Sequence, residues 1–554
     1  MPSSKMGETK HKMKKHKHSE KERSSKKRKQ SEKESPPTKK RETALSLASR
    51  LKRVRGTAES TPLPPEWSQQ SSFISSSKSF LSPEDGDVFI SCRNECYQGF
   101  YSEAPDQLPA SLHTTFDEAF DILHDAGLFL YDIVQPGGKR LSKTFVTRTL
   151  LGRPGSTYRY LGLRLFSHPW TAITEDGDTM RAGDTRSLVS LGYSEECSRG
   201  LMAFGELNTS LIERTKRVLE AQTVPHVPEG LVGSADYTLT LINRMEPTTV
   251  KKDLKRENSY GMGKTSVSWH RDSGLMDFSS IAVYHSLRDE SGDIPWRVAL
   301  RVANAPPLAV PLPSGSLYYL LDDFNHKHEH AVLAGSNQLR YSSTHRVARD
   351  GRGTWQYIRD KCRGMLDVPP SESRLVKETR AQQQLLDEIE FEWLRQWYIQ
   401  GQNHARLHPY WHKPIEKLEG WFQELEKRCL HLIEQLRKSS IGKEKVSPSV
   451  TEDVFDVLIE AMEERSKTRA LWEERVQDPI FQSMPEDMRP FSSPALDRSE
   501  DLKPLVADLR KYRGLFVKRK GEHNSMTASF TKKETRKIAS NWESMKATFS
   551  KRAK

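Results

Sequence analysis

The sequence predicts an α+β protein in which a β-sandwich or jelly-roll domain is followed by an all-α helical domain. Between about residues 230 and 348, short strand-like runs alternate with Gly, Pro and Asn, without the long helices that a parallel sheet needs. After Arg352 the apolar residues recur at helical spacing, and both ends of the chain are polar and basic. We therefore divide the chain into a basic tail and linker (1–79), a β-rich domain (80–350), a helical domain (351–510) and a basic C-terminal tail (511–554).

The charge is concentrated at the two ends of the chain. Residues 1–60 carry a net charge of +13 and residues 510–554 one of +11, whereas the whole chain carries +13. The low-complexity Lys/Ser/Glu/His sequence of the first 60 residues cannot bury enough apolar surface to fold, so we expect it to be disordered. Its basic clusters at 24–30 and 49–55 favour import into the nucleus, with the cytoplasm as a second compartment. A solvated tail without a specific partner is the alternative.

The C-terminal tail combines basic residues with aromatic ones. Phe516, Phe530, Trp542 and Phe549 alternate with Lys and Arg, a pattern that can hold single-stranded nucleic acid by charge and stacking. A solvated tail is the equally weighted alternative.

Composition excludes several classes of protein. The five cysteines are too few and too scattered for a disulfide framework. Cys92 and Cys96 are spaced for a metal, but no second pair of Cys or His follows, which argues against a zinc site. No apolar run is long enough to span a membrane, and the N-terminus has no apolar signal core. We therefore expect no membrane association and a reducing compartment.

Local patterns predict the main elements. An amphipathic helix is expected over 114–127, where Phe116, Phe120, Ile122 and Leu123 lie close to one face and Gly127 ends the helix. Strands are expected at 237–242, 265–270, 279–286, 296–303, 316–323 and 330–336.

The helical domain should contain at least three helices. One is expected over 376–400, which has no Gly or Pro, and a third should begin at a capping box of Ser449 and Glu452 and reach about residue 475. The second, over 413–437, carries one apolar stripe: Ile415, Leu418, Phe422, Leu425, Cys429, Leu432 and Leu436. Such stripes are usually core, so we assign them no chemistry.

A candidate metal site begins where the predicted strand 265–270 ends. His270 and Asp272 are two residues apart, and a bend there can turn both side chains toward one point. Two His and one carboxylate form the facial triad of non-haem Fe(II) oxygenases. The second His comes from His326, His328 or His330, which would share one face of an extended strand. We choose His330, because it opens an apolar run and lies ten residues before Arg340.

Arg340 suits a co-substrate carboxylate. If the co-substrate is 2-oxoglutarate, its far carboxylate needs a cation, and the guanidinium fork of Arg binds it best. We expect Arg340 on the strand next to that of the distal His. His345, between Thr344 and Arg346, is interpreted as structural.

Several segments together resemble a known family. The Arg-x5-Arg spacing of Arg340 and Arg346 resembles the AlkB group of nucleic-acid dealkylases. GMGKTSVSWHRD, LYYLLDDFNHKHEHAVLAGS, RYSSTHRVA and EIEFEWLRQWYIQGQ resemble the FTO family specifically, over about residues 80–510. The resemblance implies a double-stranded β-helix (jelly-roll) catalytic domain followed by an FTO-type helical domain. It implies Fe(II) bound by His270, Asp272 and His330, and 2-oxoglutarate bound by Asn243, Tyr318, Arg340, Ser342 and Arg346.

The resemblance also implies a substrate site. FTO relatives hold a flipped base between a Tyr and the first iron-binding His, and hydrogen-bond it with an Arg. Here Tyr160 is the stacking candidate, Tyr158 flanks it, and Arg148 is the candidate donor. Unlike those relatives, this chain has Ser273 in place of the acidic residue that follows the metal-binding Asp, and Arg271 in place of a His. Base preference is therefore left open at this position.

The expected activity is that of an Fe(II)- and 2-oxoglutarate-dependent dioxygenase using molecular oxygen. The resemblance implies demethylation of N6-methyladenosine in RNA, with N3-methylated pyrimidines in single-stranded RNA or DNA as secondary substrates. One alternative is an oxygenase that acts on protein side chains. The other is a catalytically silent RNA-binding scaffold; the presence of all three metal-binding residues and both arginines argues against this second alternative.

Overall fold

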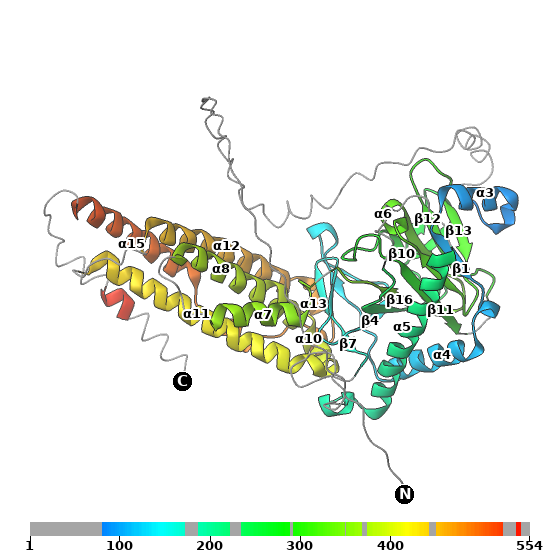
Figure 1. Ribbon diagram of the computed structural model, residues 1–554, viewed down its shortest axis with the longest axis horizontal. Coiled ribbons are helices and arrows are strands. Elements are labelled where there is room, and N and C mark those ends of the chain that lie inside the picture. The colour runs from blue at the N-terminus through cyan, green and yellow to red at the C-terminus, as the bar shows by residue number, and fades with distance from the viewer. Residues whose placement is uncertain are drawn as a thin grey trace, which may run out of the picture. The chain divides into compact units, whose positions relative to one another are not determined.

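The computed structural model describes residues 80–171, 187–221, 234–288, 292–349, 351–367, 374–442, 450–523 and 539–543 (Figure 1). The basic clusters of the first 79 residues, Ser449, Phe530 and Phe549 lie outside the described residues.

Two sheets form the β-rich domain, which confirms the predicted jelly roll; all their strand pairs are antiparallel except β4 with β7, which is parallel. The larger sheet has the strand order β1-β14-β11-β16-β8-β4-β7, and the smaller one β13-β12-β15-β10-β9. The larger sheet consists of β1 Phe100–Glu103, β14 Leu317–Leu320, β11 Ile281–Arg288, β16 Leu339–Arg346, β8 Leu239–Met245, β4 Thr147–Gly152 and β7 His168–Pro169. The smaller sheet consists of β13 Leu308–Pro311, β12 Arg297–Arg301, β15 Glu329–Leu333, β10 Gly263–His270 and β9 Arg256–Glu257. Two hairpins lie outside these sheets: β2 Ile133–Val134 with β3 Ser142–Lys143, and β5 Thr157–Tyr160 with β6 Leu163–Phe166.

Two helices cover the outer face of the larger sheet, α4 (Ala110–Asp125) and α5 (Glu195–Ala221) (Figure 1). Phe116 of α4 stacks on Tyr284 of β11 with ring centroids 3.9 Å apart. The helix predicted over 114–127 is confirmed, although it begins four residues earlier, and Gly127 follows its end with a φ of 72°. A positive φ of this kind favours glycine after a helix.

The larger sheet extends further toward the N-terminus than the sequence predicted. Its strands β1, β4 and β7 all precede residue 230, where the predicted strands began. Every residue of β4 is buried, so this strand has no alternation of apolar and polar residues to reveal it.

The helical domain contains the predicted helices with some differences. It includes α7 Trp355–Leu366, α8 Leu375–Asp387, a π-helical turn Glu388–Leu394, α9 Arg395–Tyr398, α10 Gly401–Leu407, α11 His412–Ile441, α12 Glu452–Val476, α13 Pro479–Gln482, α14 Pro494–Asp497 and α15 Leu502–His523. The predicted stripe of α11 is buried along its whole length, as expected of core. The capping box predicted at Ser449 is wrong, because α12 begins at Glu452 with Thr451 as its N-cap.

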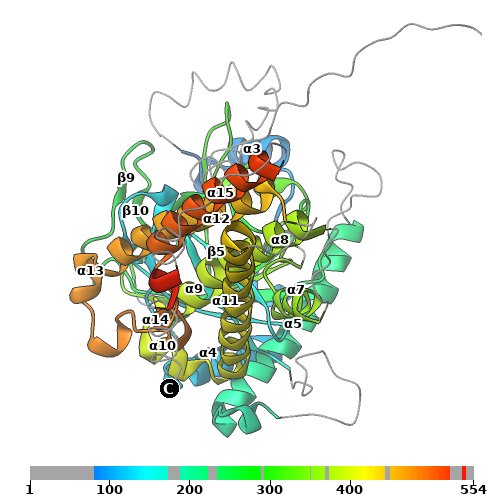
Figure 2. The same cartoon turned by 90° about the vertical axis from the view of Figure 1, so that its left-hand side faces the viewer.

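Two of the C-terminal aromatic residues, Phe516 and Trp542, belong to the core of this domain. Helix α15 continues past the predicted boundary at residue 510, and α11, α12 and α15 run alongside one another (Figure 2). Phe516 is 3% exposed and Trp542 is 4% exposed, both within the cluster formed by these helices. The interpretation of these two residues as a stacking surface for nucleic acid is therefore wrong, since their rings are covered.

Direct contacts join the helical domain to the β-rich domain. Trp411 donates from Nε1 to the carbonyl of Ser167 (2.8 Å). Nearby, the buried rings of His168, His408 and His404 form a stack in which successive centroids are 4.0 Å apart. In the described part of the chain, no helix is long and apolar enough to cross a membrane.

Candidate active site

Pairing of β10 with β15 brings two of the predicted ligands together. His270, the last residue of β10, lies directly opposite His330 in the antiparallel register. Their ring centroids are 4.2 Å apart. The register shifts between Val267 and His270, an irregularity that re-aims the end of the strand.

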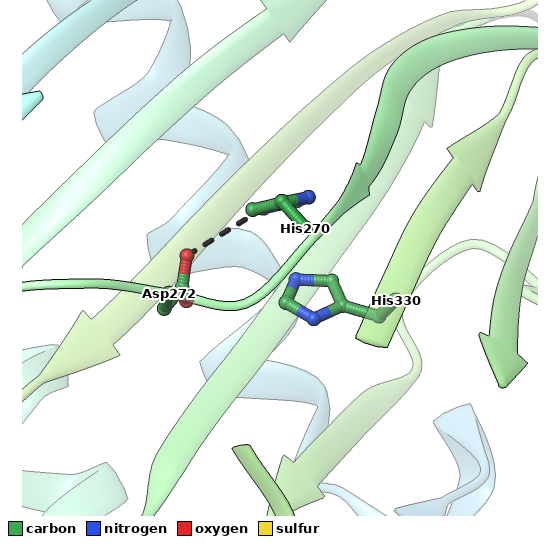
Figure 3. Close-up of side chains that lie close together, drawn as sticks. All are labelled: His270, Asp272 and His330. Atoms are coloured by element: carbon green, nitrogen blue, oxygen red, sulfur yellow. Dashed lines mark ion pairs between the residues drawn. The ribbon is translucent and has the colours of Figure 1, made fainter. Parts of the chain in front are cut away.

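Asp272 completes a cluster of three possible ligands. It follows the end of β10, and its Oδ1 lies 3.6 Å from Nε2 of His270 (Figure 3). One ligand atom from each of His270, Asp272 and His330 lies within 4.8 Å of the other two. Two imidazoles and one carboxylate are the donor set that suits non-haem Fe(II), so the residues fit the expected metal.

Neighbouring groups orient the cluster. Nδ1 of His270 lies 2.8 Å from the carbonyl of Ser268, which places the proton of the neutral ring on Nδ1 and leaves Nε2 to bind a metal. Asn325 accepts from the Asp272 backbone N–H at 2.9 Å and donates to the Asp272 carbonyl at 2.8 Å. Asn325 could not be identified as a site residue from the sequence, because no motif or spacing distinguishes it from its neighbours.

The other two histidines of this segment lie elsewhere. Residues Phe324–Lys327 form a short helix, α6, so the expectation that the three histidines share one extended strand is wrong. His328 is buried, and its Nε2 lies 2.8 Å from the carbonyl of Cys96. His326 accepts from the backbone N–H of Phe278 through Nε2 (3.2 Å).

Charge and burial set the protonation of the cluster. Burial raises the pKa of Asp272, but the charge of Arg346, whose Nη2 lies 3.1 Å from Oδ2, outweighs burial and lowers the pKa below its usual range. Burial lowers the pKa of His330 to about 3. At neutral pH the cluster therefore presents an ionised carboxylate and a neutral His330, the forms that bind a metal.

The five residues expected to bind 2-oxoglutarate share the inner face of the larger sheet. Asn243 of β8 is opposite Ser342 of β16, with Arg340 and Arg346 two and four residues away on the same face. Tyr318 of β14 is opposite Val283 of β11, which is in turn opposite Thr344. The expected strand neighbourhood is wrong: β16 pairs with β11 and β8, whereas β15, which carries His330, is in the smaller sheet.

Arg340 is prepared for an anion. Its side chain is 1% exposed, and burial lowers its pKa to about 10. Nη1 donates to Sδ of Met245 (3.1 Å), and the Tyr318 hydroxyl lies beside the guanidinium. Within the ranges that the structure describes, Nε and Nη2 have no hydrogen-bond partner. Among the described residues no carboxylate pairs with it. A buried cation without a counter-charge is costly, so the residues present fit the carboxylate of 2-oxoglutarate.

The predicted substrate residues lie beside this cluster. The hydroxyl of Tyr158 accepts from Nη1 of Arg346 (3.1 Å) and hydrogen-bonds with the exposed Ser273. The guanidinium of Arg148 lies 4.0 Å from the ring centroid of Tyr160. One face of Tyr160 is therefore occupied by Arg148.

Asp132 is a further residue of this site that the sequence did not reveal. Its Oδ2 lies 2.6 Å from Nε of Arg148, and both side chains are buried. A lone Asp before a two-residue strand carries no sequence signal of such a partner.

Comparisons with known proteins cover most of the chain. The family model for the FTO catalytic domain matches residues 87–349, and that for the FTO C-terminal domain matches residues 353–511. The alpha-ketoglutarate-dependent dioxygenase FTO of Xenopus laevis is 31% identical over 471 residues, which cover 78% of this chain and 91% of the relative.

Similar solved structures include a prolyl hydroxylase from Trichoplax adhaerens in complex with a hypoxia-inducible factor peptide fragment and the protein OsALKBH1. The prolyl hydroxylase has 11% identity and a TM-score of 0.27, covering 48% of this chain and 91% of that one. OsALKBH1 has 12% identity and a TM-score of 0.26, covering 45% of this chain and 97% of that one. At these TM-scores neither likeness bears on fold or function. The two domain matches and the Xenopus laevis relative show that this chain belongs to the FTO family of Fe(II)- and 2-oxoglutarate-dependent dioxygenases.

Proposed function

We propose that the protein oxidatively removes methyl groups from bases in RNA, chiefly from N6-methyladenosine. N3-methylated pyrimidines in single-stranded RNA or DNA are the proposed secondary substrates. The observation that carries the proposal is the pair of Arg148 and Tyr160 beside the Asp272–Arg346 ion pair. To hold an extracted base, an enzyme needs an aromatic ring and a hydrogen-bond donor next to the metal-binding side chains.

We assign Fe(II) to His270, Asp272 and His330, and 2-oxoglutarate to Asn243, Tyr318, Arg340, Ser342 and Arg346. Bound together with oxygen, they supply the oxidation that converts 2-oxoglutarate to succinate and carbon dioxide and the methyl carbon to formaldehyde. The protein contributes position and charge. Arg340 holds the far carboxylate, and Arg346 keeps Asp272 ionised.

The base would be held by Arg148 and Tyr160. The Asp132 carboxylate pairs with Nε of Arg148, so the two terminal nitrogens of the guanidinium remain as donors to the base. Arg148 covers one face of Tyr160, which leaves the other for stacking. Ser273 offers a hydroxyl where the relatives carry a carboxylate, and we assign base preference to this position.

The basic clusters at 24–30 and 49–55 support a nuclear location as part of the proposal. A fluorescent fusion of the whole chain with both clusters changed to Ala should lose nuclear enrichment. Unchanged enrichment would contradict the location proposed.

The activity is tested by measuring succinate and formaldehyde from an oligoribonucleotide containing N6-methyladenosine, with Fe(II), 2-oxoglutarate and oxygen. Wild type should release both products, and His270→Ala neither. His326→Ala is the matched control, because it removes a histidine near the site that lies outside the three-residue cluster. It should retain most of the activity.

Other outcomes identify other functions. Succinate without formaldehyde from any methylated RNA or DNA would contradict the substrate and favour an oxygenase acting on protein, which methylated and unmethylated peptides would then test. No product from iron-loaded protein would favour the silent RNA-binding scaffold.

A further inference from the structure

Two lysines from distant parts of the chain meet on one tyrosine ring beside the proposed base pocket. Nζ of Lys143 lies 4.1 Å from the ring centroid of Tyr131, and Nζ of Lys251 lies 5.1 Å from it. Lys251 also donates to the Tyr131 hydroxyl (3.2 Å). We call Tyr131, Lys143 and Lys251 the lysine clamp.

Backbone hydrogen bonds fix the positions of both lysines. Lys143 belongs to β3, where it pairs in register with Ile133 of β2, two residues after Tyr131. The backbone N–H of Lys251 donates to the carbonyl of Pro247 (2.9 Å), in the turn that follows β8. Their meeting is therefore set by the fold, since 107 residues separate Lys143 from Lys251 in the sequence but both contact Tyr131.

The lysine clamp has no counter-charge within the described part of the chain. By contrast, Lys327 lies 2.6 Å from Asp323, and Lys361 lies 2.5 Å from Glu388. No ion pair joins Lys143 or Lys251 to a described carboxylate, and Asp253, the nearest acid in sequence to Lys251, pairs with neither. The exposed residues Lys139, Arg140 and Lys252 add further positive charge next to the clamp in sequence.

Two like charges on one ring repel each other, and the cation–π contacts offset only part of that repulsion. An anion that contacts both ammonium groups would offset this repulsion. A phosphodiester is suited to this role, because lysine binds phosphate as a compact point charge.

The lysine clamp is joined to the proposed base pocket through consecutive contacts. Tyr131 precedes Asp132, which pairs with Arg148 at 2.6 Å. Arg148 in turn lies over Tyr160 at 4.0 Å. One backbone step and two side-chain contacts therefore link the lysine clamp to the residues proposed to hold the base.

We propose that the lysine clamp binds the phosphodiester backbone of a single-stranded nucleic acid, at a nucleotide flanking the one whose base enters the pocket. The ligand class rests on the proposed function, which the following experiment separates from the clamp itself. The contact is independent of base identity, because phosphates carry no sequence information.

The test is the salt dependence of binding, measured without catalysis. Fluorescence anisotropy with a labelled single-stranded oligoribonucleotide gives the dissociation constant between about 50 and 200 mM salt. Loss of two phosphate contacts should reduce the slope of log affinity against log salt by about 1.4 for a single strand. We expect this reduction in Lys143→Ala/Lys251→Ala and not in the charge-preserving Lys143→Arg/Lys251→Arg.

A second double variant controls for net charge. Lys216→Ala/Lys467→Ala removes the same charge from helices α5 and α12, at lysines that already have carboxylate neighbours. It should keep the wild-type slope. If both alanine pairs reduce the slope equally, or neither does, the lysine clamp does not bind phosphate and the proposal is overturned.

Two further measurements separate the clamp from the enzyme's substrate. The ratio of kcat/KM for a methylated oligoribonucleotide to that for the free methylated nucleoside should fall about 10-fold in Lys143→Ala/Lys251→Ala. If wild type demethylates neither, the proposed function fails, yet the change in salt slope still decides the clamp. If a poly-glutamate peptide binds with the same clamp-dependent slope and the oligoribonucleotide does not, the surface takes an acidic protein and the nucleic-acid proposal is wrong.

Discussion

Oδ2 of Asp132 lies 2.6 Å from Nε of Arg148, and neither side chain is more than 9% exposed. Burial raises the pKa of Asp132, and the opposing charge of Arg148 lowers it only in part. Arg148 is opposite Asn243 in the register of the larger sheet, so the pair is set into its inner face. The carboxylate holds one edge of the guanidinium and thereby aims the other edge.

Replacement of this carboxylate should impair substrate use more than co-substrate use. In Asp132→Asn we expect kcat/KM for the methylated oligonucleotide to fall roughly 10- to 100-fold, because Arg148 loses its orientation. Loss of one partner of a buried pair should also lower the free energy of unfolding by about 3–5 kcal/mol. Succinate formed without substrate should change little. Asp117→Asn, which breaks the more exposed pair with Arg288, should affect neither rate, and equal loss of both rates in Asp132→Asn would contradict an orienting role.

Arg340 should lower the stability of the protein without ligand and should be required for binding of the co-substrate. Because no described carboxylate neutralises its buried cation, Arg340→Met should leave the protein without co-substrate as stable as wild type or more stable. With Mn²⁺ present, 2-oxoglutarate at 100 times its Kd should stabilise wild type by about 2.7 kcal/mol and the variant not at all. Thermal unfolding measures both effects. Arg301→Met, which removes a cation paired with Glu329, should keep the ligand-induced shift; if Arg340→Met also keeps it, the assignment is wrong.

Asn325 should act on metal affinity through Asp272. Its amide holds both backbone groups of Asp272, so Asn325→Ala should weaken Mn²⁺ binding about 10- to 100-fold. Calorimetric titration measures this without catalysis. Asn403→Ala removes a half-buried amide that donates to Met488 in the helical domain, and its Kd for Mn²⁺ should equal that of wild type. A similar Kd in both variants would show that Asn325 has no role in positioning the ligand.

The stack of His168, His404 and His408 should make the protein acid-sensitive. Burial lowers the pKa of all three imidazoles, that of His408 to about 4. The unfolded chain therefore binds protons below about pH 6.5 that the folded protein does not, so stability is complete above that pH and falls toward pH 4. Protonation of His408 alone should lower the free energy of unfolding by about 2 kcal/mol between pH 7.5 and pH 5.

Urea denaturation of wild type and His408→Gln at the two pH values isolates this term. The variant should lose less stability than wild type on acidification by about that amount. His431→Gln, at an exposed histidine of α11, should lose as much stability on acidification as wild type does. Identical pH dependence in wild type and His408→Gln would exclude the stack as the source.

Phe516 should contribute to stability and not to nucleic-acid binding. It is buried against α12, where its ring centroid lies 5.4 Å from that of Phe455. Phe516→Ala should therefore cost about 3–5 kcal/mol in urea denaturation and leave the oligoribonucleotide affinity of the folded protein unchanged. Its exposed neighbour gives the control Val517→Ala, which should cost far less. A large loss of affinity at full folding would restore the stacking interpretation.

The elements that the sequence predicted correctly are those whose pattern is local. The stripe of α11 and the strands after residue 237 follow from apolar spacing, because burial of one face imposes a period on the residues themselves. His270 and Asp272 could be paired because they are two residues apart. The resemblance to the FTO family implied a role for residues such as Asn243, for which spacing offers no signal, and that role remains a prediction.

Tertiary structure decided what depends on contact between distant residues. The sequence could not choose His330 by strand alternation, because His326, His328 and His330 are two residues apart and would share one face of a strand. The structure separates them, since α6 contains His326 and β15 contains His330. It did not place Arg340 in the opposite sheet from His330, nor reveal Asn325 as the partner of Asp272, which is 53 residues away. By itself the sequence determined the domains' local elements and the chemical types available to the site. Strand order and helix packing decided which charges are paired, which are left for a ligand, and which aromatic rings are covered, because a local pattern records that a side chain is buried but not by what.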